Sequence, residues 1–233
     1  MIGFNRSKMQ RIAPTIGLML LLTGSAWGLD WQGKVDNDLR DLRSPNAQVR
    51  LQALRRIGDY SRQRATPHIL ASLEDDDPRV QRLAATMAAE RRLGAAVPVL
   101  TTWLSHWDQS MRVTAADALG ELGATQATRA LVRTLSDPEV KVRLAIVRAL
   151  GRITTDDRRE VVPLLARLRD TSSKVRQAVV TALAAKGDRR AVIPLMAILD
   201  DPSHRVRLEA VTALGTLGDR GAGPALVRQV RDS

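Results

Sequence analysis

The sequence predicts an all-α fold, a right-handed α-solenoid of about six helix pairs. An apolar residue, usually followed by Arg, recurs at intervals of 31, 31, 31, 33 and 31 residues, and a Gly or Ala stands nine residues after it. Such a period, kept along most of a chain, indicates stacked repeats. Aromatic residues make up only 3% of the 233 residues, so the core must consist of thin aliphatic layers. The apolar residues are Val49, Val80, Met111, Val142, Val175 and Val206, followed by Gly58, Ala89, Gly120, Gly151, Ala184 and Gly215.

The first helix of each repeat has recognisable start and stop signals. Four copies begin near Asp or Ser followed by Pro, where the side-chain oxygen can cap free amides and Pro fits the first turn. At the other end we expect the closing Gly to make a left-handed turn, and we expect less sharply made helix ends at Ala89 and Ala184. The start signals are Ser44-Pro45, Asp77-Pro78, Asp137-Pro138 and Asp201-Pro202.

A second helix follows each closing residue, with apolar positions seven, eleven and fifteen residues beyond it. The third copy shows Ala127, Leu131 and Leu135. In the fourth copy two additional residues around Thr154 and Thr155 shift the set and account for the interval of 33. Neither helix of a repeat can bury its apolar stripe alone, whereas stacked repeats can.

The first 28 residues predict a secretory signal peptide. A basic start (Arg6, Lys8 and Arg11) precedes an apolar run that is densest at residues 18–22, and the small residues Ala26 and Gly28 suit cleavage after Gly28. The protein would then be exported to the periplasm or cell envelope. An uncleaved membrane anchor is the alternative, because residues 12–29 carry no charge over 18 residues.

Residues 29–43 predict an N-terminal capping helix, and residues 44–233 the repeat array. Val35, Leu39 and Leu42 lie at helical spacing before the first repeat. The chain stops three residues after Val230, with no polar capping helix to cover the last apolar layer. We therefore expect this edge to dock on something, including another copy end to end, or the array to continue in a longer protein.

At this point the repeats resemble a known family. The stretch Asp201-Pro202, Val206-Arg207 and Ala213-Leu214-Gly215-Thr216-Leu217-Gly218-Asp219 is similar to the short HEAT repeat of the type found in bilin lyases. The resemblance covers residues 44–230 and implies an armadillo-like helical solenoid. It does not fix a function, because the family includes scaffolds, bilin lyases, DNA-alkylation readers and deoxyhypusine hydroxylases.

The sequence offers no residues for catalysis, for a metal or for a cofactor. The hydroxylase members bind two irons through His-Glu pairs, but in this sequence none of His68, His106 and His204 is followed by Glu. The absence of cysteine excludes thiol nucleophiles and Cys-ligated zinc. The acidic pairs and triplets stand in connections between helices, where capping and the helix dipole explain them.

The Arg after each apolar residue has two interpretations. The preferred one is structural, with the guanidinium spanning toward carboxylates or carbonyls of the inter-repeat loops. The other is a phosphate-binding ladder. Gln81 interrupts the series under either interpretation. The series consists of Arg50, Arg112, Arg143, Arg176 and Arg207.

Partner-binding candidates come from residues that do not repeat. If the second helices line the concave surface, Arg129, Arg133, Arg167 and Arg228 make a partly basic groove there, although a solvated helix face would have the same composition. Trp103 and Trp107, one turn apart, suit an interface hot spot. Trp103 can also fill a layer thinned by small residues.

Three classes of function follow. The leading one is a non-catalytic exported scaffold that binds protein partners in the cell envelope. The alternative is binding of nucleic acid or another polyanion through a basic concave groove, suggested by a net charge of +11 and by 31 Arg against five Lys. Export argues against nucleic acid. A bilin-lyase-like enzyme is the third class and rests on the repeat resemblance alone.

Overall fold

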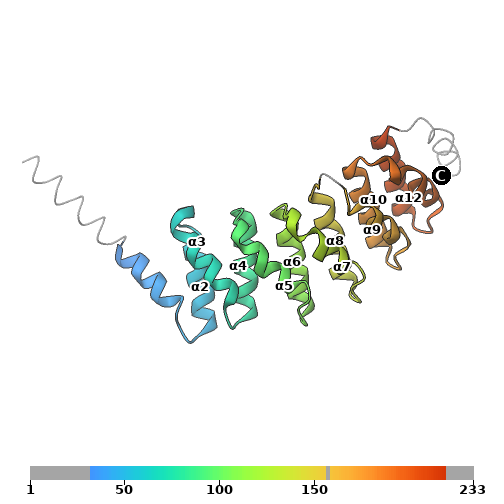
Figure 1. Ribbon diagram of the computed structural model, residues 1–233. Helices are drawn as coiled ribbons and strands as arrows, with labels where there is room; N and C mark the ends of the chain where they lie inside the picture. Colours follow the sequence, from blue (N-terminus) through green and yellow to red (C-terminus); the bar gives the residue numbers. More distant parts are fainter. Residues whose placement is uncertain (1–31, 156–157, 219–233) are drawn as a thin grey trace, which may run out of the picture. The chain divides into compact units, whose positions relative to one another are not determined.

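The computed structural model describes residues 32–155 and 158–218, and the chain divides into two compact units, Met1–Tyr60 and Ser61–Ser233 (Figure 1). No strand occurs in the described residues. The predicted leader, residues 1–28, lies outside them. In the first unit residues 32–41 are helical, where a capping helix was expected, and α2 (Ala47–Ile57) follows.

A buried carboxylate ties the two helices of the first unit together. Asp38 is 4% exposed and accepts hydrogen bonds from Arg56 Nε at 2.5 Å and from the Tyr60 hydroxyl at 2.6 Å. Arg56 also donates to Asp41 at 2.6 Å. Burial and the bond to Asp38 raise the pKa of Tyr60 to about 12. The first unit is therefore held by charge-assisted bonds around one aspartate.

The second unit is an α-solenoid, as the sequence predicts. Consecutive first helices contact one another, and each second helix contacts the first helix of the next repeat. The first helices are α4 (Pro78–Glu90), α6 (Gln109–Glu121), α8 (Val140–Arg152), α10 (Ser173–Lys186) and α12 (His204–Leu217). The second helices are α3 (Arg62–Ala71), α5 (Val97–Trp103), α7 (Thr128–Arg133), α9 (Val161–Ala166) and α11 (Val192–Ala197). Short 3₁₀ turns extend them at η2 (Ser72–Glu74), η3 (Gly94–Ala96), η4 (Thr125–Ala127), η5 (Arg167–Arg169), η6 (Arg189–Ala191) and η7 (Ile198–Asp200).

The predicted apolar layers form the core. On the second helices Ala127, Leu131 and Leu135 are at most 3% exposed. The recurring apolar residues of the first helices are buried as well, from Val80 to Val206. The longer fourth repeat adds a polar element to this core, because Glu160 and Lys186 form a buried ion pair with Oε1 and Nζ 2.8 Å apart. Thr155 donates to the same carboxylate at 2.6 Å.

The expected left-handed turns occur elsewhere, so that prediction was wrong. Gly120, Gly151 and Gly215 lie inside helices α6, α8 and α12. The left-handed residues in the second, third, fifth and sixth repeats stand three positions later, at Arg92, Gly123, Gly187 and Gly218. The end of α10 is consequently sharp in spite of Ala184, since Gly187 supplies the turn at φ 62°. Arg92 makes the same turn at φ 53°, a backbone conformation that residues other than glycine rarely adopt.

The start signals are confirmed for α4 but shifted for other helices. Asp77 caps α4, and its side chain accepts from the backbone N–H of Arg79. Helices α8 and α12 start after Glu139 and Ser203, two residues beyond the aspartates of their Asp-Pro pairs. Those aspartates are used instead for bonds between repeats.

The glycines inside the first helices allow close packing between repeats. A Cβ built on Gly120 would lie 2.7 Å from Ala149 Cα, and one built on Gly151 would lie 3.1 Å from Ala182 Cβ. Backbones therefore approach closely along the row of first helices, whereas the second helices carry larger core residues such as Leu131.

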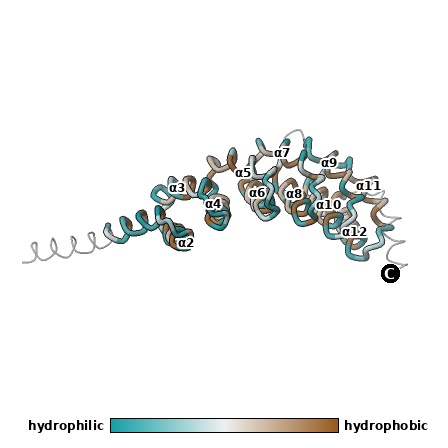
Figure 2. Tube along the Cα trace, turned by 90° about the horizontal axis from the view of Figure 1, so that it is seen from below, coloured by the Kyte–Doolittle hydropathy of each residue, from teal (hydrophilic) through white to brown (hydrophobic). Residues whose placement is uncertain are grey.

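This difference in packing between the two rows of helices determines which side of the second unit is concave. The second helices lie along the outer side of the curved row and the first helices along its inner side (Figure 2). The expectation that the second helices line the concave surface was therefore wrong. Small residues draw the first helices together, so the row curves toward them.

The recurring arginines form a structural ladder, as preferred in the sequence analysis. In three of the five arginines the guanidinium donates two hydrogen bonds to the aspartate of the next inter-repeat loop, and its Nη1 donates to carbonyls of its own loop. The paired residues are Arg112 with Asp137, Arg143 with Asp170 and Arg176 with Asp201, at 2.7–3.1 Å. The bonds from Arg176 lower the pKa of Asp201 below its ordinary value. These guanidiniums are thus occupied within the fold.

At one place in the ladder both the arginine and the aspartate of the pair are replaced by other residues. Gln81 stands at the arginine position, and His106 at the aspartate position of the following loop. His106 Nδ1 accepts from the backbone N–H of Asp108 at 3.0 Å, as Asp201 Oδ1 accepts from Ser203 at 2.8 Å. The imidazole keeps the turn of the loop but supplies no carboxylate for an inter-repeat bond.

Gly120→Ala tests the close contact between first helices. We expect a loss of about 1–3 kcal/mol in unfolding free energy, because the new methyl group would clash with Ala149. Gly215→Ala is the matched control at the same repeat position, where a Cβ meets nothing within 4 Å. It should gain roughly 0.5–1 kcal/mol from helix propensity. Urea unfolding followed by circular dichroism measures both, and equal effects would contradict the proposed curvature.

Candidate protein-binding surface

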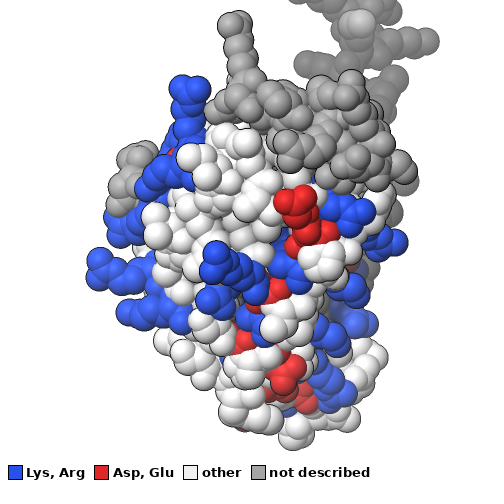
Figure 3. All heavy atoms as spheres, turned by 90° about the vertical axis from the view of Figure 1, so that its right-hand side faces the viewer, with Lys and Arg blue, Asp and Glu red and all other residues white. Residues whose placement is uncertain are grey.

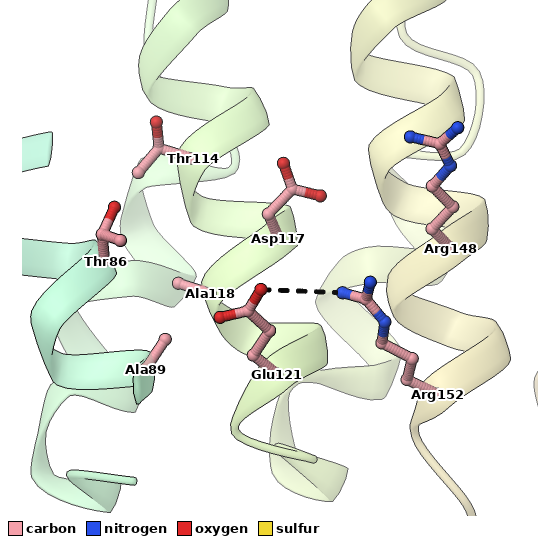
Figure 4. A pocket seen from close by; sticks show the side chains of 8 residues that line it. All are labelled: Thr86, Ala89, Thr114, Asp117, Ala118, Glu121, Arg148 and Arg152. Carbon is pink, nitrogen blue, oxygen red and sulfur yellow. Dashed lines mark ion pairs between the residues drawn. The ribbon is translucent and has the colours of Figure 1, made fainter. Parts of the chain in front are cut away.

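A hollow opens on the inner side of the second unit, across α4, α6 and α8 (Figure 4). It has a volume of about 380 Å³. Its floor is made of small buried residues, Ala89 and Ala118, which leave room above them. Its lining consists of Thr86, Ala89, Thr114, Asp117, Ala118, Glu121, Arg148 and Arg152.

A neighbouring hollow of about 350 Å³ lies across α8 and α10. Arg148 belongs to both hollows, so the two are adjacent on the inner side. The lining is more apolar here, with half-buried Leu144 and Ala178 beside Gln177. The two hollows together extend along four consecutive first helices.

One repeat position on this surface holds Thr in three copies of the second unit, Asp in another and Arg in the remaining one. The sixth residue after the recurring apolar residue is polar in every copy of the second unit and is exposed in all but one. The residues are Thr86, Asp117, Arg148, Thr181 and Thr212. The residues that do repeat are used in the core and the ladder, so the inner surface carries the chain's individual chemistry.

Asp117 is the half-buried member of this set. Burial raises the pKa of its carboxyl group, which Arg152 and Arg148 counter only in part. Asp117 makes no hydrogen bond and no ion pair with the described residues. Glu121, one turn further along α6, faces Arg152 with Oε1 and Nη1 4.0 Å apart. The hollow thus contains a desolvated carboxylate without a donor.

Two threonines add further acceptors beside Asp117. Thr86 Oγ1 donates to the Arg82 carbonyl at 3.1 Å, and Thr114 Oγ1 donates to the Ser110 carbonyl at 2.9 Å. A hydroxyl has one hydrogen, so each has only lone pairs left for a ligand. In Figure 4 Thr114 lies on the same helix as Asp117, and Thr86 lies on the neighbouring helix α4.

The structure places the sequence-predicted residues on several elements. Arg129 and Arg133 are exposed on α7, and Arg167, in η5, lines a separate hollow with Asp137 and Asp170. Arg228 lies outside the described residues. The three described arginines are on second helices, away from the hollows of the inner side, and so they do not line the expected concave groove.

The two tryptophans have different environments. Trp103 is 7% exposed and fills a core layer, which was the alternative to a hot spot. Trp107 is 84% exposed in the loop before α6, with its ring centroid 5.4 Å from that of His106. Trp107 therefore remains a candidate contact residue, at the loop edge and not on the inner side.

Sequence reasoning missed Asp117, Thr86 and Arg148, although a signal was present. The signal is the variation of one helical position between otherwise regular copies. It could not be assigned to a binding surface before the inner side of the curve was known.

Charges of both signs mix on the surface. Figure 3 shows basic side chains bordering a broken line of acidic ones, with no face of one sign in that view. No group of three His, Asp or Glu side chains suited to a metal occurs in residues 32–155 and 158–218. Over the same residues no helix has the length and apolar character needed to cross a bilayer.

Asp117→Asn should raise the melting temperature at pH 7. A carboxyl group whose pKa is raised by folding lowers stability once it is ionised, so an uncharged amide removes that cost. The gain should shrink as the pH falls and Asp117 becomes protonated. Thermal melts from pH 7 down to pH 4 measure it.

Glu209→Gln is the matched control on the same side. Its carboxylate accepts from Thr181 at 2.6 Å and from Gln177 at 3.3 Å, so this change should lower stability slightly. A lower melting temperature for Asp117→Asn would mean that its carboxylate is bonded within the fold.

Comparison with known proteins identifies the repeats. The sequence model of HEAT repeats matches residues 38–106, 97–166 and 161–233. No curated protein sequence matches the chain.

Several solved structures share the fold. YibA of Escherichia coli has a TM-score of 0.66 at 20% identity, covering 86% of this chain and 76% of that one. A designed armadillo repeat protein in complex with the peptide (KR)4 has a TM-score of 0.62 at 19% identity, covering 78% and 98%. The CpcE–CpcF complex of phycocyanin lyase from a Nostoc species has a TM-score of 0.58 at 24% identity, covering 82% and 79%. With the sequence model matching nearly all of the chain beyond residue 37, this protein belongs to the HEAT-repeat family.

Proposed function

We propose that this protein is a non-catalytic scaffold that binds a protein segment along the inner side of α4–α12. One observation carries the proposal: Thr86, Asp117, Arg148 and Thr181, which share one repeat position, line the two hollows, while the recurring apolar and Arg residues are used by the core and the ladder. A HEAT-repeat fold fits a protein-binding role, because stacked repeats present an extended, preformed surface. A neighbour in fold, the designed armadillo repeat protein, holds a peptide in its own structure.

Two other functions have less support. Polyanion binding would use a face of one sign, but the ladder occupies several arginines and Figure 3 shows mixed charges. A lyase-like activity is suggested by one solved neighbour, the phycocyanin lyase complex. The described side chains include no nucleophile paired with a base to which a reaction step could be assigned.

We also propose that the scaffold works in the cell envelope. The basic start, the apolar run and the small residues of positions 1–28 support this part of the proposal. Cell fractionation followed by intact-mass measurement tests it. A species in the envelope that starts at Leu29 is expected, whereas a full-length membrane species would identify an anchor and a cytosolic species would overturn export.

Filling the hollows should abolish binding of peptides. We would select peptides from a random display library on the purified protein and measure them against Thr114→Trp/Ala178→Trp, which places one indole in each hollow. Binding should fall at least about tenfold while the melting curve stays unchanged. Arg129→Glu/Arg133→Glu on α7 is the control and should bind normally. Loss of binding in that variant alone would transfer the site to the second helices.

A further inference from the structure

We propose that the hollow across α4 and α6 receives one basic side chain, Lys or Arg, of the protein partner, with Asp117 as its counter-ion. The inference rests on the proposed function and specifies the chemistry of the partner at one position. It follows from the acceptor atoms that line this part of the hollow and from the lack of a hydrogen-bond donor to Asp117 among the described residues.

The α4 and α6 wall presents hydrogen-bond acceptors. Asp117 offers two carboxylate oxygens, and the hydroxyls of Thr86 and Thr114 have already donated their hydrogens to their own helices. An ammonium or guanidinium group brings several donors and no acceptor, so it matches these atoms. A carboxylate or phosphate from a partner would find a donor on this wall only if a threonine hydroxyl gave up the bond within its own helix.

Comparison with Glu209 shows that an unpaired carboxylate is not a general property of the inner side. Glu209 lies on α12 and accepts hydrogen bonds from Thr181 and Gln177 of the preceding first helix. Asp117 has no such donor on α4, where Thr86 and Ala89 face it across the hollow. The step between α10 and α12 thus supplies donors to its carboxylate, and the step between α4 and α6 does not.

The two arginines of α8 do not take the place of the partner. Arg152 stands 4.0 Å from Glu121, and no ion pair joins Arg148 to Asp117. Arg148 is exposed, so its flexible side chain can compete for Asp117 only by giving up hydration and rotamer freedom. Removing Arg148 should therefore strengthen the binding of a basic partner. This effect is opposite in sign to the effect expected from removing the Asp117 charge, and it provides a second test.

The peptides selected on the unmodified protein provide the test. We expect Lys or Arg at one fixed register of the selected sequences. Asp117→Asn should weaken these peptides about thirtyfold, as expected for removing one partner of a buried charge pair, and Arg148→Ala should tighten them. Glu209→Gln, the matched control, should change their affinity less than about twofold. A fresh selection on Asp117→Lys should yield Asp or Glu at the same register.

The outcomes separate this inference from the proposed function. If no selected peptide responds to the filled-hollow variant, the proposed function fails. If peptides respond to that variant but lack a basic residue, or bind Asp117→Asn as well as the unmodified protein, the scaffold stands and the inference is overturned. Tighter binding after Arg148→Ala without any effect of Asp117→Asn would also overturn it, because Arg148 would then act on another site.

Discussion

The close contact between consecutive first helices is the constraint on which the rest of the second unit depends. Gly120 against Ala149 and Gly151 against Ala182 bring neighbouring backbones together on one side of each layer. The second helices, on the opposite side, carry larger buried residues such as Leu131. This asymmetry determines the direction of curvature, and the curvature determines which side chains line the hollows. The lining of the hollows thus follows from residues that have no polar chemistry of their own.

Some of the charged side chains of this protein are bonded within the fold, and others are exposed on its surface. The net charge of +11 suggests polyanion binding until the arginines are placed. Arg112, Arg143 and Arg176 are bonded to aspartates between repeats, and the bonds to the carboxylate and to loop carbonyls use four of the five N–H donors of each guanidinium, which leaves at most one for a phosphate. The arginines that remain exposed, such as Arg129 and Arg148, lie on different rows of helices.

Much of the fold could be predicted from the sequence, because each repeat shows the same local pattern. The period gave the helix pairs, the apolar spacing gave the buried layers, and the Arg series gave the ladder. Two features could not be predicted locally. The third and sixth copies have Gly at two positions three residues apart, and in both the later one, Gly123 or Gly218, makes the left-handed turn. Which side of the row is concave depends on distances between the helices of neighbouring repeats, and the sequence pattern of a single repeat does not determine those distances.

The candidate site was harder to predict for the same reason. Arg129 and Arg133 do not recur between copies, but they lie on a second helix, and the second helices are on the outer side of the row. Trp103 shows the other difficulty, since burial of an aromatic residue depends on neighbours such as Ala88 that leave space for it. Asp117 became notable only once its lack of a donor could be seen.

The rung made of Gln81 and His106 has a mechanical consequence. In the part of the second unit that the structure describes, the joints after α6, α8 and α10 are each crossed by an arginine with two bonds to a carboxylate. The joint between α4 and α6 has a neutral amide and an imidazole in those places. Tension along the row would therefore stretch this joint first, and the same joint holds the hollow with Asp117. Such stretching would widen the hollow in which Asp117 lies.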